Sequence, residues 1–253
     1  MRVSAKDRSA LDITAVINTH REGAILRPTL ASARAAAVYA ASRGVEVEIV
    51  VVLDSADDAT RQVVAEAARE GPLRRLDLDV DDLGEARNCA AAAARGRWIS
   101  FLDGDDLWGR DWLYEAFRRG SREPRLSVWH PELSVYFGGV EKVFIHRDMD
   151  DPDYDVAALA AQNQWTALGF APADLVREVR FSSTDFRSGR GYEDWAWNMA
   201  AVAHGAVHKV VPGTAHLIRV RPDSLGTRTI RSGSRPVVPQ GFFRSLIGRA
   251  ARR

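Results

Sequence analysis

Cysteine is almost absent from this chain of 253 residues, and the single Cys89 excludes an internal disulfide framework and favours a reducing, cytosolic setting. No apolar run approaches the ~18 residues that a membrane-spanning helix needs, and no apolar segment of the kind found in a secretory signal follows the basic N-terminus. Hydrophobic residues make up 46% and charged residues 27% of the chain, as is usual for a globular protein. We therefore expect a soluble protein of one large or two small domains.

Acidic residues are absent after Asp223, whereas seven arginines follow it. The net charge of +1 thus divides into +7 for this last segment and −6 for residues 1–223. A mildly acidic body does not offer the basic surface of a nucleic-acid-binding protein, so we expect no nucleic-acid partner. The seven are Arg228, Arg231, Arg235, Arg244, Arg249, Arg252 and Arg253.

The last segment, residues 241–253, combines four of these arginines with four large apolar residues. Such a composition suits peripheral contact with an anionic membrane surface. The alternative is a flexible, solvated terminus. The apolar residues are Phe242, Phe243, Leu246 and Ile247.

The first half of the chain alternates β-branched runs with Ala-rich stretches, which is typical of an open parallel α/β sheet with right-handed crossovers. In such sheets ligands bind outside the carboxyl ends of the strands. We therefore expect the site at residues 19–22, 54–58 and 103–106. The expected strands are 13–18, 45–53, 73–80 and 97–102, and the expected helices are 29–43, 57–70 and 84–95.

The second half is less regular. Its pattern predicts an antiparallel strand pair, three helices, two further strands and a linker that starts at Thr227. The pair is 126–137 with 141–146, the helices are 154–164, 173–179 and 193–204, and the last strands are 206–211 and 215–220.

Three carboxylates, Asp103, Asp105 and Asp106, follow the expected strand 97–102, and Gly104 allows a tight turn among them. Carboxylates this close repel each other, which implies a counter-charge. Mg²⁺ or Mn²⁺ would supply it, and such a cation usually binds only one or two protein carboxylates beside water and substrate phosphates. The alternative is an acidic loop in which Asp106 caps the following helix.

Two further acids, Glu193 and Asp194, open the expected helix 193–204, next to Trp195 and Trp197. Acids at a helix N-terminus are favourable with the helix dipole, which is sufficient reason for their presence. A carboxylate beside an apolar wall can also act as a general base.

Four segments resemble, in order, the family 2 glycosyltransferases of the GT-A type. They are ITAVINTHREG, EIVVVLDSADDAT, LGEARNCAAAAARGRWISFLDGDDLW and GYEDWAWNMAAVAHG. The third is the most specific, because Arg87-Asn88, the helix stop at Gly96 and the acidic loop lie in one continuous register. The resemblance covers about residues 12–222. It implies an α/β fold of the GT-A (nucleotide-diphospho-sugar transferase) kind, with a Rossmann-like, mostly parallel sheet flanked by helices.

The resemblance also implies an activity. Members of the family transfer a sugar from a nucleotide-diphosphate sugar to a hydroxyl acceptor with inversion, here with UDP, GDP or dTDP as the nucleotide and with Mn²⁺ or Mg²⁺. We expect a cytoplasmic enzyme of cell-surface polysaccharide or glycolipid synthesis. A lipid-linked acceptor would agree with contact at the inner face of the membrane through the basic tail. We expect the catalytic domain at residues 1–227 and the tail at residues 228–253.

Individual roles follow from the same resemblance. Asp105 corresponds to the metal ligand and His216 to a third ligand that some members supply. Asp194 corresponds to the base that takes the acceptor proton, with Glu193 beside it. The donor-binding residues implied are Thr19, His20, Arg21, Glu22, Asp54, Arg87, Asp103 and Gly104.

The chain also departs from the family pattern. Residues 18–21 are bulkier and more charged than the usual loop, and residues 53–56 have one acid fewer. The identity of the nucleotide base of the donor is therefore left open. Residues 162–165 are candidates for the acceptor pocket. Two other functions remain: a nucleotidyltransferase, which should carry a Gly-rich basic loop that residues 18–22 lack, and a non-catalytic protein that retains the fold.

Overall fold

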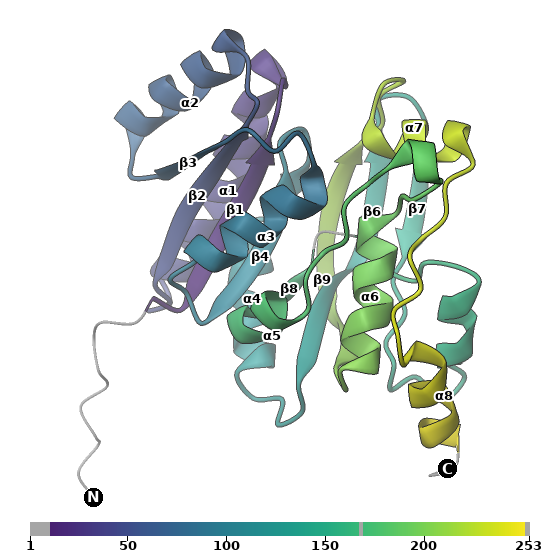
Figure 1. Ribbon diagram of the computed structural model, residues 1–253. Coiled ribbons are helices and arrows are strands. Elements are labelled where there is room, and N and C mark those ends of the chain that lie inside the picture. Colours follow the sequence, from purple (N-terminus) through teal and green to yellow (C-terminus); the bar gives the residue numbers. More distant parts are fainter. Residues whose placement is uncertain (1–10, 167–168, 251–253) are drawn as a thin grey trace, which may run out of the picture.

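The computed structural model describes residues 11–166 and 169–250, with side chains to residue 247. Within these residues nine strands form one sheet, in the order β3-β2-β1-β4-β8-β6-β9-β5, with β7 paired to β6 (Figure 1). The strands are β1 (Ile13–Thr19), β2 (Val47–Asp54), β3 (Arg74–Leu78), β4 (Trp98–Asp103), β5 (Leu107–Trp108), β6 (Ser127–Phe137), β7 (Lys142–Ile145), β8 (Phe170–Pro172) and β9 (Val207–Arg219).

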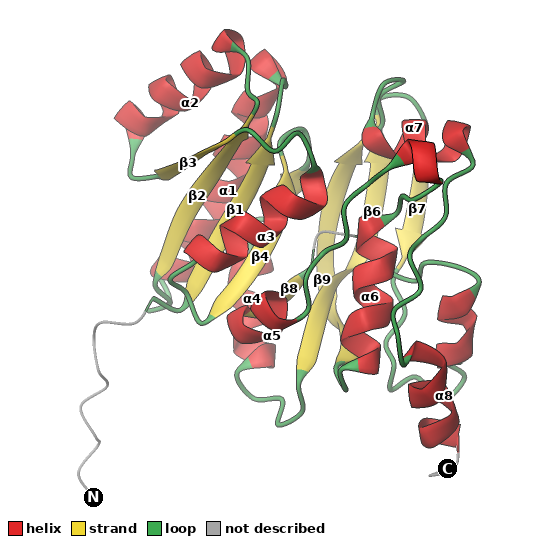
Figure 2. Cartoon of the chain, viewed as in Figure 1, coloured by secondary structure: helices red, strands yellow, loops and turns green. Residues whose placement is uncertain are grey.

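Helices cover both faces of this sheet (Figure 2). The α-helices are α1 (Leu26–Ala41), α2 (Asp58–Glu70), α3 (Leu83–Ala93), α4 (Trp112–Gly120), α5 (Ala173–Glu178), α6 (Glu193–Ala203), α7 (Leu225–Ser232) and α8 (Phe242–Ala250). The 3₁₀ helices are η1 (Gly23–Ile25), η2 (Val156–Ala160) and η3 (Phe186–Ser188).

The buried faces of β1 show how the layers arise. Successive side chains of a strand point to opposite faces of a sheet. Ile13, Ala15 and Ile17 therefore pack with residues of α1, α2 and α4, whereas Val16 packs with residues of α3, α5 and α6. A strand buried on both faces reads as a continuous apolar run, which is the pattern of β1 and β2. The α/β architecture with a curled, mostly parallel sheet is thus the one expected from the sequence.

The first half agrees closely with the expected elements: β1 to β4 are parallel, and α1, α2 and α3 lie between them. The pair β6 and β7 is antiparallel, also as expected. In the second half, the helix expected over 154–164 is only η2, and the two strands expected over 206–220 are one strand, β9. Pro212 and Gly213 do not end β9, because a bulge opposite Glu132 accommodates them.

The segment after Thr227 differs from the linker that its composition predicts, because it contains part of α7 and all of α8. Ser224 caps α7 by accepting a hydrogen bond from the backbone of Thr227. Phe242 at the start of α8 is fully buried against Met199 and Val202 of α6. In the part of the chain that is described, no helix has the length and apolar character that crossing a membrane requires.

Candidate active site

The carboxyl ends of β1, β2 and β4 meet at one edge of the sheet (Figure 1). Asp103 at the end of β4 lies in register with Asn18 of β1, and Thr19 lies in register with Leu53 of β2. The loops that follow these strands are therefore neighbours. They are the three loops that the strand-end rule selects from the sequence.

The acidic loop after β4 meets two arginines from the end of β9. Arg221 Nε lies 2.8 Å from Asp105 Oδ2. The backbone N–H of Arg219 donates to Asp106 Oδ1 at 2.7 Å, and Arg219 Nε donates to the carbonyl oxygen of Asp105 at 3.2 Å. The counter-charge that the sequence implied is thus supplied in part by arginine. The capping role considered for Asp106 is wrong, because β5 follows the loop and α4 begins only at Trp112.

Burial dominates the electrostatics of this loop. Burial raises the pKa of Asp105, and the charge of Arg221 offsets this rise only in part. It also raises the pKa of Asp106 well above the usual range, together with the neighbouring charges of Asp103 and Asp105. Glu22 shares this environment: burial raises its pKa, although the backbone N–H of His20 donates to Glu22 Oε2 at 2.6 Å.

Gly104 allows the acidic loop to approach the loop after β1. A Cβ atom at this position would lie 2.9 Å from the carbonyl oxygen of Asn18 and 3.1 Å from the side chain of Glu22. Any larger residue would therefore push the two loops apart.

Arg87 of α3 connects the two acidic sites that the sequence indicated. Its side chain is fully buried, and it donates to Asp103 Oδ1 at 2.9 Å and to Glu193 Oε1 at 2.8 Å. Burial acts to lower the pKa of Arg87, but the carboxylates of Asp103 and Glu193 outweigh it and raise that pKa. The guanidinium therefore stays charged and fixes the start of α6 against the end of β4.

Asp194 stands next to this bridge, in the first turn of α6. Burial and the charge of Glu193 raise the pKa of Asp194 to about 7, against the influence of Arg87. Asn163 Nδ2 donates to Asp194 Oδ2 at 3.0 Å. A carboxyl group with this pKa can accept or donate a proton near neutral pH.

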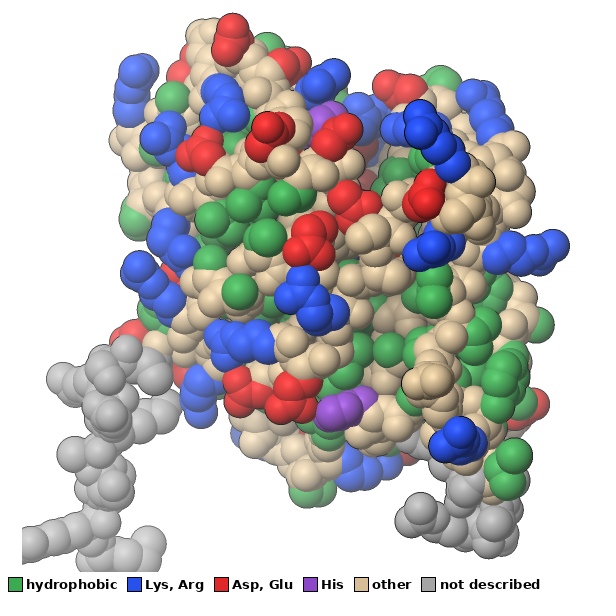
Figure 3. Space-filling model, viewed as in Figure 1, with side chains coloured by type: hydrophobic (Ala, Val, Ile, Leu, Met, Phe, Trp, Pro, Cys, Tyr) green, Lys and Arg blue, Asp and Glu red, His purple; other side chains and the backbone are tan. Residues whose placement is uncertain are grey.

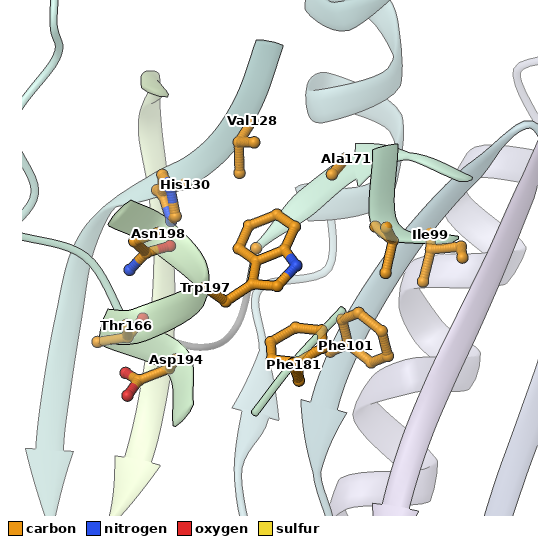
Figure 4. Close-up of a pocket in the computed structure, with 12 residues that line it drawn as sticks. Ile99, Phe101, Val128, His130, Thr166, Ala171, Phe181, Asp194, Trp197 and Asn198 are labelled. Atoms are coloured by element: carbon orange, nitrogen blue, oxygen red, sulfur yellow. The ribbon is translucent and has the colours of Figure 1, made fainter. Parts of the chain in front are cut away.

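A small cavity of about 20 Å³ lies between α6 and the sheet, and Asp194 lines it together with Thr166 and Asn198. Figure 4 shows these polar side chains on one side of α6 and Trp197 on the other side, among apolar residues. The volume is sufficient for a water molecule. Nearby, burial and the charge of Asp194 raise the pKa of Tyr136 to about 12, so the phenol keeps its proton.

The other expected donor residues lie at the same edge but are largely engaged with the protein. The hydroxyl of Thr19 donates to the carbonyl oxygen of Val52 at 2.6 Å. Asp54 Oδ1 accepts from the backbone of residue 80 at 2.8 Å and of residue 81 at 3.1 Å. His20 Nδ1 lies 2.7 Å from the carbonyl oxygen of Asp54. Arg21 is exposed. Thr19 and Asp54 thus shape the loops, whereas Arg21 is accessible.

His216, the expected third metal ligand, lies in the core. Its ring makes an edge contact with Trp112, with centroids 4.5 Å apart, and neither ring nitrogen has a hydrogen-bond partner. Burial lowers the pKa of His216 well below its usual value. Among the described residues, no three His, Cys, Asp or Glu side chains are grouped so that they could hold a metal ion. The structure therefore does not unite His216 with Asp105 in such a group.

Arg219, Arg221 and Tyr136 were not among the candidates from the sequence. The signal that was available is the sequence RVRP at the end of β9, in which two arginines alternate just where the strand reaches the edge. Asn163 falls in the stretch 162–165 proposed for the acceptor pocket, and its bond to Asp194 brings that stretch to the site.

A parallel sheet whose strand ends carry an acidic loop, with a carboxylate at the start of a later helix beside it, has the architecture of GT-A glycosyltransferases. Residues 14–142, half of the chain, match the family described as glycosyl transferase family 2. The chain therefore belongs to this family of glycosyltransferases.

Individual relatives agree with this assignment. The succinoglycan biosynthesis protein ExoO of Rhizobium meliloti (strain 1021) is 45% identical over 80 residues, which are 31% of this chain and 23% of that protein. The match thus spans about a quarter of the curated relative. The structure of S. aureus TarS 1–349 in complex with UDP-GlcNAc is similar, with a TM-score of 0.67 and 18% identity over 93% of this chain and 64% of that one.

A second structure has the same fold. The mannosyltransferase PcManGT from Pyrobaculum calidifontis, in complex with GDP-Man and Mn²⁺, matches with a TM-score of 0.61 and 18% identity, over 97% of this chain and 71% of that one. At this level of identity the likeness establishes the fold.

Proposed function

We propose that the protein transfers a sugar from a nucleotide-diphosphate sugar to a hydroxyl group of an acceptor, with inversion and with a divalent cation. The observation that carries the proposal is the buried bridge of Arg87, which joins Asp103 at the donor edge to Glu193 beside Asp194. A donor loop and a carboxyl group poised near neutral pH thus belong to one rigid site. The structures that bind UDP-GlcNAc and GDP-Man have the same fold and support a nucleotide sugar as the donor.

The donor lies, in this proposal, along the ends of β1, β2 and β4. Glu22 and Asp54 line the base and ribose side with the loop of Thr19, His20 and Arg21. Asp103 and Gly104 border the sugar and the diphosphate, and Arg87 holds Asp103 in place. The identity of the nucleotide base is left open, so the donor nucleotide is UDP, GDP or dTDP.

The side chains at Asp105 fit a divalent metal. Carboxylate oxygens are the ligands that Mg²⁺ and Mn²⁺ prefer, and a single protein carboxylate is sufficient when substrate phosphates complete the shell. Asp105 would hold the cation, which would stabilise the negative charge that develops on the departing diphosphate. Arg221 already pairs with Asp105 Oδ2, so it competes for the same oxygen. His216 stays a predicted ligand only.

Asp194 accepts the proton of the acceptor hydroxyl in this proposal. The neighbouring charge of Glu193 helps to keep its pKa near 7, and Asn163 orients its carboxyl group. In-line attack on the face of the sugar opposite the diphosphate inverts the anomeric centre. Holding base, hydroxyl and donor together converts an encounter of three groups into a single step, which lowers the barrier by several kcal/mol.

The cellular setting is part of the proposal. The name of ExoO supports a role in polysaccharide synthesis. We propose a cytoplasmic enzyme with residues 1–227 as the catalytic domain and residues 228–253 as a basic tail at the inner face of the membrane. Phe243 and Ile247 of α8 are 57% and 71% exposed, which supports membrane contact through this helix, beside a lipid-linked acceptor.

Calorimetric titration with UDP-, GDP- and dTDP-sugars, with and without Mn²⁺, tests the function. At least one donor should bind more tightly with the metal, and Asp105→Ala should abolish this gain. Glu46→Ala is the matched control, since Glu46 is an exposed carboxylate at the opposite end of β2. Failure of all three donors to bind would contradict the proposal, and binding without any turnover would favour a non-catalytic protein.

A further inference from the structure

Two segments far apart in the sequence pack together beside the start of α6. Gly191 N donates to the carbonyl oxygen of Arg235 at 3.0 Å, and Arg235 N donates to the carbonyl oxygen of Gly189 at 2.9 Å. Arg190 and Arg235 form a parallel β-bridge. The segment 224–235, which contains α7, is therefore fixed to the loop 185–192 that leads directly into Glu193 and Asp194.

The packing between these segments is close. A Cβ atom at Gly191 would lie 2.6 Å from Thr229 Cγ2 of α7, so only glycine fits at this point. The surface formed by the two segments is thus a fixed border of the site, which we name the arginine rim.

Five arginines make up the arginine rim, and all of them are exposed. Among the described residues none of the five forms an ion pair. Figure 3 shows Lys and Arg side chains gathered over α7, at the upper right of the molecule. The five are Arg187, Arg190, Arg228, Arg231 and Arg235.

Asp185 is the single acid within the two rim segments, 185–192 and 224–235. Its carboxylate accepts hydrogen bonds from neighbouring residues, and the charge of Arg190 also acts on it. It accepts from the hydroxyl of Ser188 at 2.6 Å and from the backbone of Arg187 at 3.0 Å. The guanidinium of Arg228 lies 5.1 Å from the ring centroid of Phe186, a contact that leaves its N–H groups available. The rim therefore concentrates positive charge on a body that is otherwise acidic.

Like charges that are held together repel each other, and here the chain supplies few acids to offset them. Guanidinium groups bind phosphate with paired, charge-assisted hydrogen bonds. The position of the rim indicates which substrate it would contact. In the proposed function the donor diphosphate lies at Asp103 and Asp105, and Arg87 joins Asp103 to Glu193, two residues after Gly191. The rim also adjoins the donor edge, because Thr227 of α7 donates to the carbonyl oxygen of Arg221 at 3.1 Å. It therefore borders the start of α6, where Asp194, the proposed base for the acceptor, is located.

We propose that the arginine rim binds a phosphate group of the acceptor, and so orients the neighbouring acceptor hydroxyl toward Asp194. The inference rests on the proposed function for its orientation toward Asp194, whereas phosphate binding by the rim stands independently. The phosphate could belong to a lipid headgroup or to a free phosphorylated molecule, and the two sources have the same chemistry at the arginines.

Calorimetry with inorganic tripolyphosphate in the absence of metal tests the rim. The double variant Arg190→Gln/Arg235→Gln should bind this probe at least fivefold more weakly than the native chain. The control Arg75→Gln/Arg122→Gln removes two exposed arginines that also lack ion pairs in the described structure, and should remain within twofold. Unfolding midpoints of both variants, compared with that of the native chain, verify that the substitutions leave the fold intact.

Vesicles distinguish the source of the phosphate. If the native chain also sediments with phosphatidylglycerol vesicles but not with phosphatidylcholine vesicles, and the rim variant does not, the phosphate is lipid-borne. If only tripolyphosphate binding depends on the rim, the acceptor phosphate is free. Equal tripolyphosphate binding by the native chain and the rim variant overturns the inference.

The native chain titrated with nucleotide sugars separates this inference from the proposed function. Donor binding together with an unchanged rim variant refutes the rim alone. A rim effect without any donor binding leaves a phosphate site on a protein whose proposed function is wrong.

Discussion

Arg221 Nε lies 2.8 Å from Asp105 Oδ2, so an arginine from the end of β9 neutralises the carboxylate that we propose as the metal ligand. The contact is an ion pair without a hydrogen bond, because Nε has no hydrogen-bond partner in the structure. In the proposed function, a cation held by Asp105 would compete with Arg221 for Oδ2, and a released Arg221 would be able to pair with the diphosphate.

We therefore predict that Arg221→Gln binds Mn²⁺ more tightly than the native chain in the absence of nucleotide. The gain should be about fivefold at most, because a partly exposed ion pair contributes at most about 1 kcal/mol. Electron paramagnetic resonance of free Mn²⁺ measures the affinity. Arg244→Gln, an exposed arginine on α8, serves as the control. Weaker Mn²⁺ binding by Arg221→Gln would refute the competition.

Arg87→Met should destabilise the fold strongly. It leaves Asp103 and Glu193 without their shared counter-charge, and removal of one partner from a buried ion pair costs about 3–5 kcal/mol. Urea unfolding measures the loss. Arg180→Met, which removes an exposed arginine paired with the partly exposed Glu85, should cost less than about 1 kcal/mol. Similar losses for the two variants would show that the bridge contributes little.

The donor edge could be predicted because its signals are local. β-branched runs indicate β1 and β2, and the position of the acidic loop after an apolar run places it at the end of β4. The register of Asp103 with Asn18 then brings the loops together. The first two steps need no long-range contact, and the pairing of β1 with β4 follows from the alternation of strands and helices in a parallel sheet.

The second half could not be predicted in the same way. The bond between Arg87 and Glu193 joins residues 106 positions apart, and no local pattern encodes it. The burial of Phe242 depends on a partner surface on α6 that composition does not reveal. His216 has the residue type of a metal ligand, but Trp108 and Trp112 enclose its ring in the core. Tertiary packing decides these three cases.

Asp194→Asn should retain donor binding and lose turnover, by on the order of 10²–10⁴-fold, because an amide cannot accept the proton. Since the pKa of Asp194 is raised to about 7, turnover of the native chain should fall about tenfold per pH unit below pH 7 and level off above it. Turnover rates at saturating donor, measured from about pH 5 to about pH 9 so that the range brackets this pKa, test both expectations. Asp174→Asn, an exposed acid on α5, is the control.

The same substitution should affect stability in a defined direction. A carboxyl group whose pKa is higher in the folded chain than in the unfolded chain stabilises the fold at low pH and loses this contribution as the pH rises through about 7. Asp194→Asn removes this buried charge, so its free energy of unfolding at pH 8 should exceed that of the native chain. In the turnover experiment described above, a normal rate for Asp194→Asn would exclude Asp194 as the base.

Acid should weaken the fold through its buried histidines. Burial lowers the pKa of His146 to about 4, and the unfolded chain titrates near 6.5, so the folded state binds fewer protons between these values. The contribution of a neutral His146 is complete above about pH 6.5 and is lost on acidification, by ~1.4 kcal/mol per pH unit. The raised pKa of Asp194 acts in the opposite direction. The free energy of unfolding of the native chain therefore combines both effects and does not isolate that of His146.

The test therefore compares the native chain with His146→Gln by urea unfolding at pH 7.5 and at about pH 5, a span that crosses the ordinary histidine pKa. A glutamine can still accept the hydrogen bond that Thr166 N donates to His146 Nε2 at 3.3 Å. His146→Gln should lose less stability on acidification than the native chain, by about 2 kcal/mol. His204→Gln, which removes a half-exposed histidine paired with Glu178, should follow the native chain. Parallel losses for the native chain and His146→Gln would mean that His146 takes up a proton without cost in the folded state.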